Sequence, residues 1–127
     1  MLCNVVYCIL FLTFGTVAPS TLGPLISRPA LYHLRLPVQT ASWYHLPGQM
    51  TASGVEYGGM TAAHRSLRFG EVRTLCRQDH PLICASVKIV DRGPFVDGRE
   101  WDVSKEVAKK LHFTRRGLLA VRVTGER

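Results

Sequence analysis

An acidic residue at the end of a strand-like run is the strongest candidate for chemistry in this sequence. Residues 86–90 alternate polar and apolar side chains, Asp91 follows them, and Arg92-Gly93-Pro94 then predicts a turn. Such a turn frees the carboxyl group from strand pairing. A carboxyl group on a rigid strand end can act as a general acid that protonates a leaving oxygen. The residues alone equally allow Asp91 to cap the turn or to pair with Arg92.

A histidine in a segment of small residues is the second candidate. His64 follows Thr61-Ala62-Ala63, whose short side chains permit close packing or the close approach of a ligand. Near a carboxylate, an imidazole can hold the acid in the needed orientation or share its proton. The alternative is a core histidine whose ring nitrogens bond to the backbone.

Charge favours an anionic partner. The 127-residue chain carries 16 Lys and Arg against 9 Asp and Glu, a formal net charge of +7, and five of the basic residues lie in region 105–116. Nucleic acid is not expected as the partner, because no basic stretch is interleaved with aromatic residues and no reading helix is recognised. Trp43 and Tyr44 could stack on sugar rings or belong to the core.

The N-terminus predicts export. Residues 1–27 carry no charge, and the apolar run at 5–17 is too short to span a bilayer but typical of a signal peptide. We expect a signal peptide at 1–20, a Pro-punctuated arm at 21–40 and one domain at 41–127. The alternative is that the apolar run is a buried strand or helix of the domain.

Two of the four cysteines, Cys3 and Cys8, would leave with the signal peptide. Cys76 and Cys84 remain and flank a turn-forming stretch, which in an exported protein predicts a disulfide. Two reduced thiols are the alternative, and no second Cys/His pair has the spacing of a zinc site.

The elements that must position these residues are short strands and one helix. Strand-like runs lie at 72–75, 86–90 and 118–123. Ser104 can cap a helix that has Glu106 in its first turn and an apolar stripe beyond, and Gly117 ends this region. Many short strands with one helix predict a small β-barrel.

A series of short motifs carries a family resemblance. In order, the sequence contains Ala41-Ser42-Trp43-Tyr44, Thr51-Ala52-Ser53-Gly54, Thr61-Ala62-Ala63-His64-Arg65-Ser66-Leu67, Phe69-Gly70, Asp91-Arg92-Gly93-Pro94-Phe95, Gly98-Arg99 and Asp102-Val103-Ser104. Over about residues 41–124 this pattern resembles the rare lipoprotein A family of septal-ring lytic transglycosylase-like proteins. The resemblance implies a mainly β fold, a six-stranded double-psi β-barrel with one or two short helices, acting on peptidoglycan.

The resemblance also implies a site built from an Asp, a His and a Glu. Asp91 and His64 match the first two, whereas Val55 occupies the position of the family's acid and Glu56 follows one residue late. A shorter link to Thr61 could bring Glu56 back into the site. The substrate-binding residues expected from the motifs are Tyr44, Ser53, Arg65, Arg92 and Arg99. For Asp102 a capping or structural role is expected.

The chemistry implied by this family is non-hydrolytic. Asp91 would protonate the glycosidic oxygen between muramic acid and glucosamine and then take the proton of the muramic acid 6-hydroxyl, which attacks C1 and leaves a 1,6-anhydro end. No metal or organic cofactor and no stable membrane span is implied, and the location is the periplasm or cell envelope. Two alternatives are an expansin-like module that binds glycan without cutting it, and a hydrolase that pairs Asp91 with Glu56 or Asp102.

Overall fold

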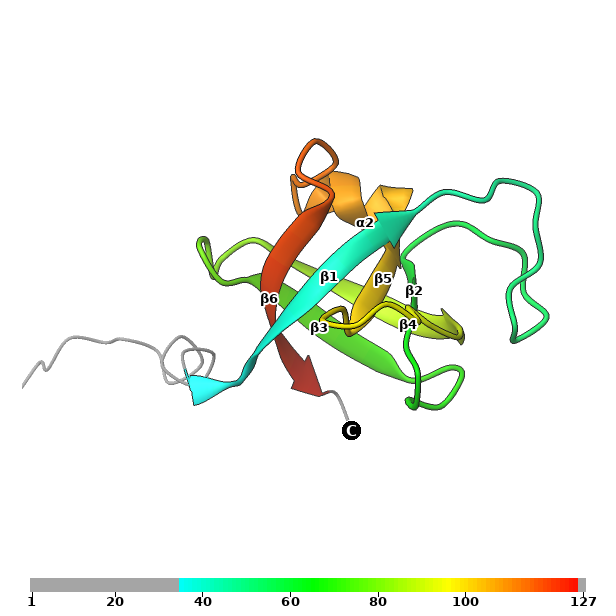
Figure 1. Ribbon diagram of the computed structural model, residues 1–127, viewed down its shortest axis with the longest axis horizontal. Helices are drawn as coiled ribbons and strands as arrows, with labels where there is room; N and C mark the ends of the chain where they lie inside the picture. Colours follow the sequence, from blue (N-terminus) through cyan, green and yellow to red (C-terminus); the bar gives the residue numbers. More distant parts are fainter. Residues whose placement is uncertain (1–34, 126–127) are drawn as a thin grey trace, which may run out of the picture.

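The computed structural model describes residues 35–125, whose strands close into a barrel (Figure 1). Along the chain the elements are β1 (Val38–Tyr44), β2 (Thr61–Ala63), β3 (Val72–Arg77), β4 (Cys84–Asp91), β5 (Trp101–Ser104), α2 (Lys105–Lys110) and β6 (Leu118–Gly125). Around the barrel the strand order is β1-β5-β2-β4-β3-β6. The expected six-stranded barrel with a short helix is therefore confirmed.

The expected signal peptide at 1–20 and most of the expected arm at 21–40 lie outside the described residues. β1 begins at Val38, so the barrel includes the last residues of that arm. Within residues 35–125, no helix combines the length and the apolar character needed to cross a bilayer.

Two parallel strand pairs bring distant segments of the chain together. β1 runs parallel to β5, with Ser42 opposite Asp102, and β2 runs parallel to β4, with Ala62 opposite Ile89. Parallel neighbours need long connections rather than tight hairpins. Segment 45–60, between β1 and β2, is part of the long connection between the parallel neighbours β1 and β5.

The core forms because side chains alternate across each strand. In β4, Ala85, Val87 and Ile89 are buried, whereas Ser86 and Lys88 between them are exposed. The helix adds Val107 and Ala108 to the same cluster. The cluster is completed by large side chains from the other strands and from the segment after α2, namely Leu75, Trp101, Val103, Leu111, Phe113, Leu119 and Val121.

The helix begins where the sequence predicts. The Ser104 hydroxyl accepts a hydrogen bond from the backbone N–H of Val107 at 3.3 Å, and Glu106 lies in the first turn. Asp102 therefore does not cap α2. It lies two residues earlier, within β5, and its carboxylate accepts a hydrogen bond from Ser42 instead.

Cys76 and Cys84 lie opposite each other on β3 and β4 and form a disulfide, so the expected pairing is confirmed. Next to it, the Arg77 side chain is buried and connects β3 to the segment after α2. Its Nη1 donates to the carbonyls of Leu111 and His112 at 2.8 and 3.1 Å. Its Nε and Nη2 bond to the Asp79 carboxylate at 2.8 and 2.6 Å.

Reduction of the Cys76–Cys84 bond is expected to lower the free energy of unfolding by about 2.6 kcal/mol, because the bond removes chain entropy from a short loop of the unfolded state. Urea unfolding with and without reductant measures this. Both cysteines should resist alkylation in the folded, unreduced protein. A double Cys→Ser variant is the control and should not respond to reductant, while alkylation of either thiol before reduction would contradict the prediction.

Candidate functional site

The Asp91 carboxylate, at the C-terminal end of β4, is held by three donors. Its Oδ1 accepts hydrogen bonds from the backbone N–H groups of Ala52 and Arg92, both at 2.9 Å. Its Oδ2 accepts a hydrogen bond from the Tyr44 hydroxyl at 3.3 Å. The three donors come from β1, from segment 45–60 and from the turn after β4, so the carboxylate connects three parts of the barrel end.

A row of residues runs across four neighbouring strands at this end of the barrel. Ala63 of β2 is the register partner of Asp91 on one side and of Asp102 on the other. Asp102 is in turn the partner of Ser42 on β1, whose hydroxyl donates to Asp102 Oδ1 at 3.0 Å. Two carboxyl groups therefore flank the small side chain of Ala63.

Segment 45–60 is fastened to this row through two tyrosines. The Tyr57 hydroxyl donates to the Tyr44 carbonyl at 2.5 Å and accepts from the Lys105 N–H at 2.9 Å. The two aromatic rings meet edge to face, with centroids 4.9 Å apart. The Ser53 N–H also donates to the Val90 carbonyl at 3.0 Å. These contacts fix the segment that supplies the Ala52 N–H to Asp91.

The surroundings change the acidity of two groups in the site. Burial, together with the neighbouring charge of Asp91, raises the pKa of Tyr44 well above its ordinary value, so its hydroxyl stays a donor. Burial also raises the pKa of Asp102. The hydrogen bond from Ser42 and the charge of Arg99 oppose this rise, and the charge of Asp91 adds to it.

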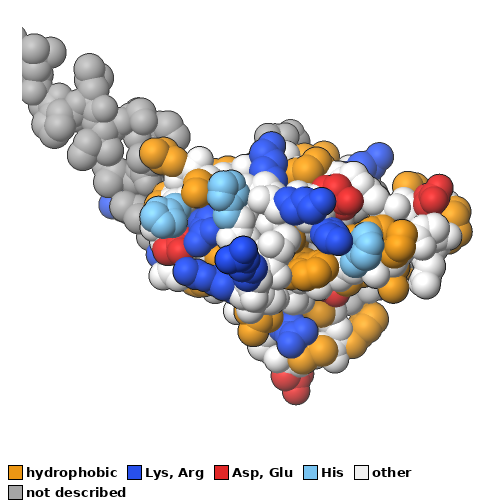
Figure 2. All heavy atoms as spheres, turned by 90° about the horizontal axis from the view of Figure 1, so that it is seen from above, with side chains coloured by type: hydrophobic (Ala, Val, Ile, Leu, Met, Phe, Trp, Pro, Cys, Tyr) orange, Lys and Arg blue, Asp and Glu red, His pale blue; other side chains and the backbone are white. Residues whose placement is uncertain are grey.

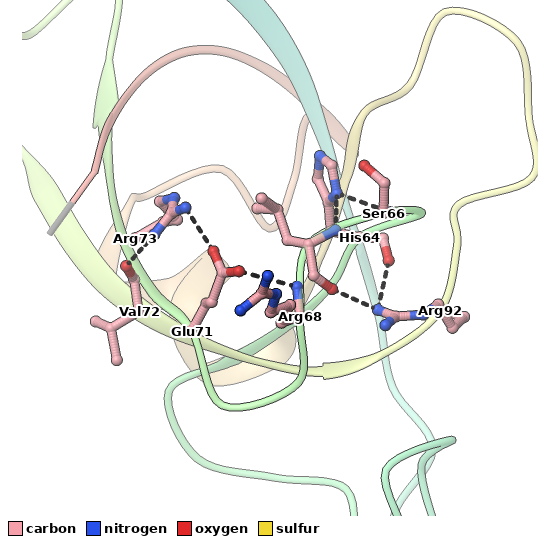
Figure 3. A network of polar contacts seen from close by, with 8 residues as sticks. His64, Ser66, Arg68, Glu71, Val72, Arg73 and Arg92 are labelled. Carbon is pink, nitrogen blue, oxygen red and sulfur yellow. Dashed lines mark hydrogen bonds and ion pairs between the residues drawn. The ribbon is translucent and has the colours of Figure 1, made fainter. Parts of the chain in front are cut away.

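His64 makes its contacts on its own loop and on the core. Its Nδ1 accepts from the backbone N–H groups of Ser66 and Leu67, both at 3.2 Å (Figure 3). Its ring centroid lies 4.7 Å from that of Trp101. Burial, followed by the charges of nearby arginines, lowers the pKa of His64, which favours a neutral ring with the proton on Nε2.

The connection between His64 and Asp91 runs through the backbone. The His64 N–H donates to the Asp91 carbonyl at 3.2 Å. Within residues 35–125 no hydrogen bond joins the imidazole to the Asp91 carboxylate. The imidazole thus follows the second of the two expected patterns, a ring bonded to backbone groups.

Two of the expected substrate-binding arginines hold loops around the site. Arg65 donates from Nε to the Pro94 carbonyl at 2.5 Å, and from Nη2 to the carbonyls of Val96 and Arg99 at 2.8 and 3.1 Å. It therefore braces the connection between Asp91 and β5.

Arg92 braces the turn that follows β2. Its Nη1 donates to the carbonyls of His64 and Leu67 at 3.1 and 2.8 Å, and its guanidinium lies 3.8 Å from the centre of the Phe69 ring. The polar contacts continue from this turn to Glu71, which accepts from the Arg68 N–H and pairs with Arg73 (Figure 3).

Two other expected site residues, Ser53 and Glu56, have different surroundings. The Ser53 hydroxyl is within 3.1 Å of the Thr51 hydroxyl, at the edge of the site. Glu56 is exposed and pairs through its backbone with Met50, and the part of the chain that the structure describes gives its side chain no hydrogen bond or ion pair. In the same part, no group of three His, Cys, Asp or Glu side chains is placed to hold a metal ion.

Three contributors were not expected from the sequence: Ser42, the Ala52 N–H and Tyr57. Ser42 could have been found from the alternation along β1, because Ser42 and Tyr44 share a face while Trp43 packs against the core. The contact between Ser42 and Asp102 has no such signal, since 60 positions separate the two residues.

Comparisons with known proteins agree on one family. The family model described as lytic transglycolase matches residues 38–123. The probable endolytic peptidoglycan transglycosylase RlpA of Aquifex aeolicus is 44% identical over 86 residues, covering 62% of this chain and 36% of the relative. The endolytic peptidoglycan transglycosylase RlpA of Pseudomonas aeruginosa is 40% identical over 92 residues, covering 69% of this chain and 27% of the relative. The chain thus spans about a third of the length of these relatives.

Solved structures support the fold. The apo expansin of Clavibacter michiganensis superposes with a TM-score of 0.57 at 16% identity, covering 71% of this chain and 50% of that one. A mutant of that expansin in complex with cellohexaose gives a TM-score of 0.55 at 14% identity, with the same coverage. At this identity the likeness concerns the architecture of the barrel.

Proposed function

Because this chain belongs to the lytic transglycosylase family, which confirms the resemblance to rare lipoprotein A, we propose that it cleaves peptidoglycan glycan strands. The bond cut joins N-acetylmuramic acid to N-acetylglucosamine, and the product ends in 1,6-anhydro-N-acetylmuramic acid. The names of the relatives support the activity and the substrate. The proposal concerns what this barrel itself does, because the matched region covers only 36% and 27% of the lengths of these two relatives.

The position of the Asp91 carboxylate is the single observation on which the proposal rests. It lies at a strand end, fixed by donors from three parts of the chain. In the reaction, the bond from C1 to the glycosidic oxygen breaks and a bond from C1 to the 6-oxygen of the same sugar forms. The 6-hydroxyl loses a proton and the leaving oxygen gains one, so the net reaction needs no other reactant. Asp91 exchanges protons with these oxygens.

The remaining parts of the site position this carboxylate. The attacking hydroxyl belongs to the substrate and is held at high effective concentration, so the protein needs to supply only orientation and proton transfer. Tyr44 and the Ala52 N–H hold Asp91 from one side. We assign His64 to positioning, because its Nδ1 fixes the turn whose carbonyls bind Arg92.

The charge of the surface fits a substrate of the cell envelope. Lys and Arg side chains are spread over the face seen in Figure 2. Lys109 and Lys110 are exposed in the last turn of α2. Glycan strands stripped of their peptides carry free lactyl carboxylates, which a basic surface attracts over about 8–10 Å at ordinary salt. The protein would reach this substrate by export through its N-terminal signal.

Mass analysis of the products from purified glycan strands tests the proposal. Anhydro ends support a lytic transglycosylase. Reducing ends would replace it with a hydrolase that uses two carboxyl groups. Binding of the strands without any product would replace it with an expansin-like binding module, the alternative that the displaced Glu56 favours.

Replacement of Glu56 by Gln is expected to change the rate of anhydro-end formation by less than about twofold, because this exposed side chain lies outside the contacts of Asp91. A charge-matched control is Glu106→Gln, on an exposed position of α2. Initial rates on the same glycan preparation measure both. A loss of about 100-fold for Glu56→Gln alone, the size of a general acid–base effect, would mean that segment 45–60 delivers this carboxylate to the substrate.

A further inference from the structure

An exposed aromatic residue follows the turn that holds the Asp91 carboxylate. Phe95 lies on the connection between β4 and β5, four positions after Asp91, and 81% of it is exposed. Its neighbour Val96 is also exposed. Single apolar residues are common on protein surfaces, so exposure alone does not indicate a binding role. The indication comes from how the ring is held and from what lies beside it.

The Phe95 ring is placed by a fixed turn rather than by the core. A Cβ atom added at Gly93 would lie 3.6 Å from both Cδ2 and Cε2 of Phe95, so this edge of the ring rests beside the glycine. Gly93 has a φ of 116°, which favours glycine, and both Gly93 and Pro94 are buried. The contact leaves most of the ring surface open to a ligand.

The backbone on both sides of Phe95 is fixed by Arg65. Its Nε and Nη2 donate to the carbonyls of Pro94 and Val96, the residues before and after Phe95, at 2.5 and 2.8 Å. A phenylalanine on such a backbone has only its own two side-chain torsions left to order. The entropic cost of binding through this ring is therefore small.

The short chain between Asp91 and Phe95 keeps the ring near the candidate catalytic carboxylate. Four residues span at most about 14 Å when fully extended, and the turn at Gly93 makes the distance shorter. The same turn supplies the Arg92 N–H that donates to Asp91 Oδ1 at 2.9 Å. A glycan strand bound at Asp91 continues past this bond in both directions, so a neighbouring sugar can reach the ring.

The other aromatic residues at this end of the barrel already have partners. Tyr44 bonds to the candidate catalytic carboxylate, and Trp43 packs against the core. The guanidinium of Arg92 lies 3.8 Å from the centre of the Phe69 ring. Among residues 35–125, Phe95 has no aromatic or cationic partner. The two residues that the sequence offers for stacking on sugars are thus engaged in the fold, and Phe95 is free for that role.

We propose that Phe95 is a sugar-binding residue, whose ring stacks on the apolar face of an N-acetylhexosamine next to the bond that Asp91 acts on. The proposal rests on the transglycosylase function proposed above and adds an aromatic contact to its substrate site. In a β-linked N-acetylhexosamine the ring substituents are equatorial, so the axial C–H groups form an apolar face. The face of an aromatic ring carries partial negative charge, which suits these C–H groups.

The first arm of the test measures binding without turnover. The full chain carrying Asp91→Asn is titrated by calorimetry with soluble, peptide-free glycan strands. Adding Phe95→Ala should raise the Kd by about 10-fold, because part of an apolar side chain no longer leaves water on binding. Phe95→Leu should also raise the Kd, whereas Phe95→Tyr should stay within about twofold. The matched control is Leu82→Ala, which removes a 94% exposed apolar side chain between β3 and β4 and should leave the Kd unchanged.

The second arm measures kinetics in the protein that keeps Asp91. Phe95→Ala should raise KM by about 10-fold and change kcat by less than about twofold, because a stacked sugar is bound equally in the ground state and the transition state. If Phe95 acted only by shaping the turn around Asp91, kcat would fall instead. Thermal unfolding of the variant should match the wild type, since the side chain is exposed.

A third readout reports the stacking contact itself. The ring current of an aromatic face shifts the axial protons of a stacked sugar upfield in the NMR spectrum. Glycan oligosaccharides bound to the Asp91→Asn chain should show this shift, and Phe95→Leu should remove it. A purely structural role of Phe95 would leave the sugar resonances where they are.

The outcomes separate this proposal from the proposed function. Unchanged Kd and KM in Phe95→Ala overturn the stacking contact and leave the transglycosylase function standing. A Kd in Phe95→Leu equal to that of its parent also overturns it, because apolar bulk rather than an aromatic face would then suffice. If the wild type forms no anhydro ends while the Kd still depends on the aromatic ring, the transglycosylase function is rejected and the contact stands as part of a binding module. A parent chain that does not bind the strands at all rejects both.

Discussion

Asp91→Asn is expected to reduce the formation of anhydro ends by at least 100-fold, the lower range of what general acid–base catalysis supplies. The amide oxygen of Asn can still accept the N–H groups of Ala52 and Arg92, so the barrel end keeps its shape. The amide cannot take up the proton of the attacking hydroxyl. Glycan binding should therefore survive, and rate assays combined with pull-down of insoluble glycan measure the two effects separately.

Two comparisons make the Asp91 result specific. Asp97→Asn removes the same charge from an exposed position and should leave the rate unchanged. His64→Ala should lower the rate by less than Asp91→Asn, because the imidazole bonds to the Ser66 and Leu67 N–H groups and acts through the turn that they form. If Asp91→Asn formed anhydro ends at the wild-type rate at any pH, Asp91 would not be the catalytic residue and the proposed function would lose its main support.

The parts of this fold that could be predicted are those fixed by neighbours in sequence. Period-two alternation predicts the exposed and buried sides of β4, and Ser104 with Glu106 predicts the start of α2. The disulfide could be predicted because Cys76 and Cys84 flank one turn of the chain. Asp91 could be identified as a candidate because a strand end and a Gly-Pro turn are both local features.

The relation between the two carboxyl groups could not be predicted, because it depends on strand register. β2 has only three residues, and a register shift between Ala62 and Ala63 brings Ala63 opposite Asp91 rather than Val90. A one-residue change of register would turn the side chain to the other face. Asp102 therefore joins the site through the pairing of β5 with β1 and β2, which no local pattern specifies.

The functions of the arginines also depend on tertiary structure. In the sequence, Arg65 and Arg92 stand beside the candidate catalytic residues, and their charge favours binding of an anionic substrate. In the structure, their guanidinium groups donate to backbone carbonyls of the loops around the site. A guanidinium presents several donors in a fixed plane, which suits it to hold a loop through several carbonyls at once.

Arg65→Met is therefore expected to lower kcat by about 10- to 100-fold with a smaller change in KM, because loss of three hydrogen bonds releases the connection that follows Asp91. If Arg65 instead bound the substrate in the ground state, KM would rise while kcat stayed the same. Amide hydrogen exchange across residues 94–99 should speed up in the variant. Arg68→Met is the matched control, since this exposed side chain makes no hydrogen bond or ion pair among the described residues.

The contrast between these two arginines tests how the barrel directs its chemistry. Arg65 and Arg68 carry the same charge, lie three positions apart and follow the same strand. A purely electrostatic attraction for the glycan would make the two substitutions equivalent. A kcat effect confined to Arg65, with faster exchange at residues 94–99, would show that the geometry of the connection limits proton transfer at Asp91. Equal effects on KM from both substitutions would assign Arg65 to substrate binding.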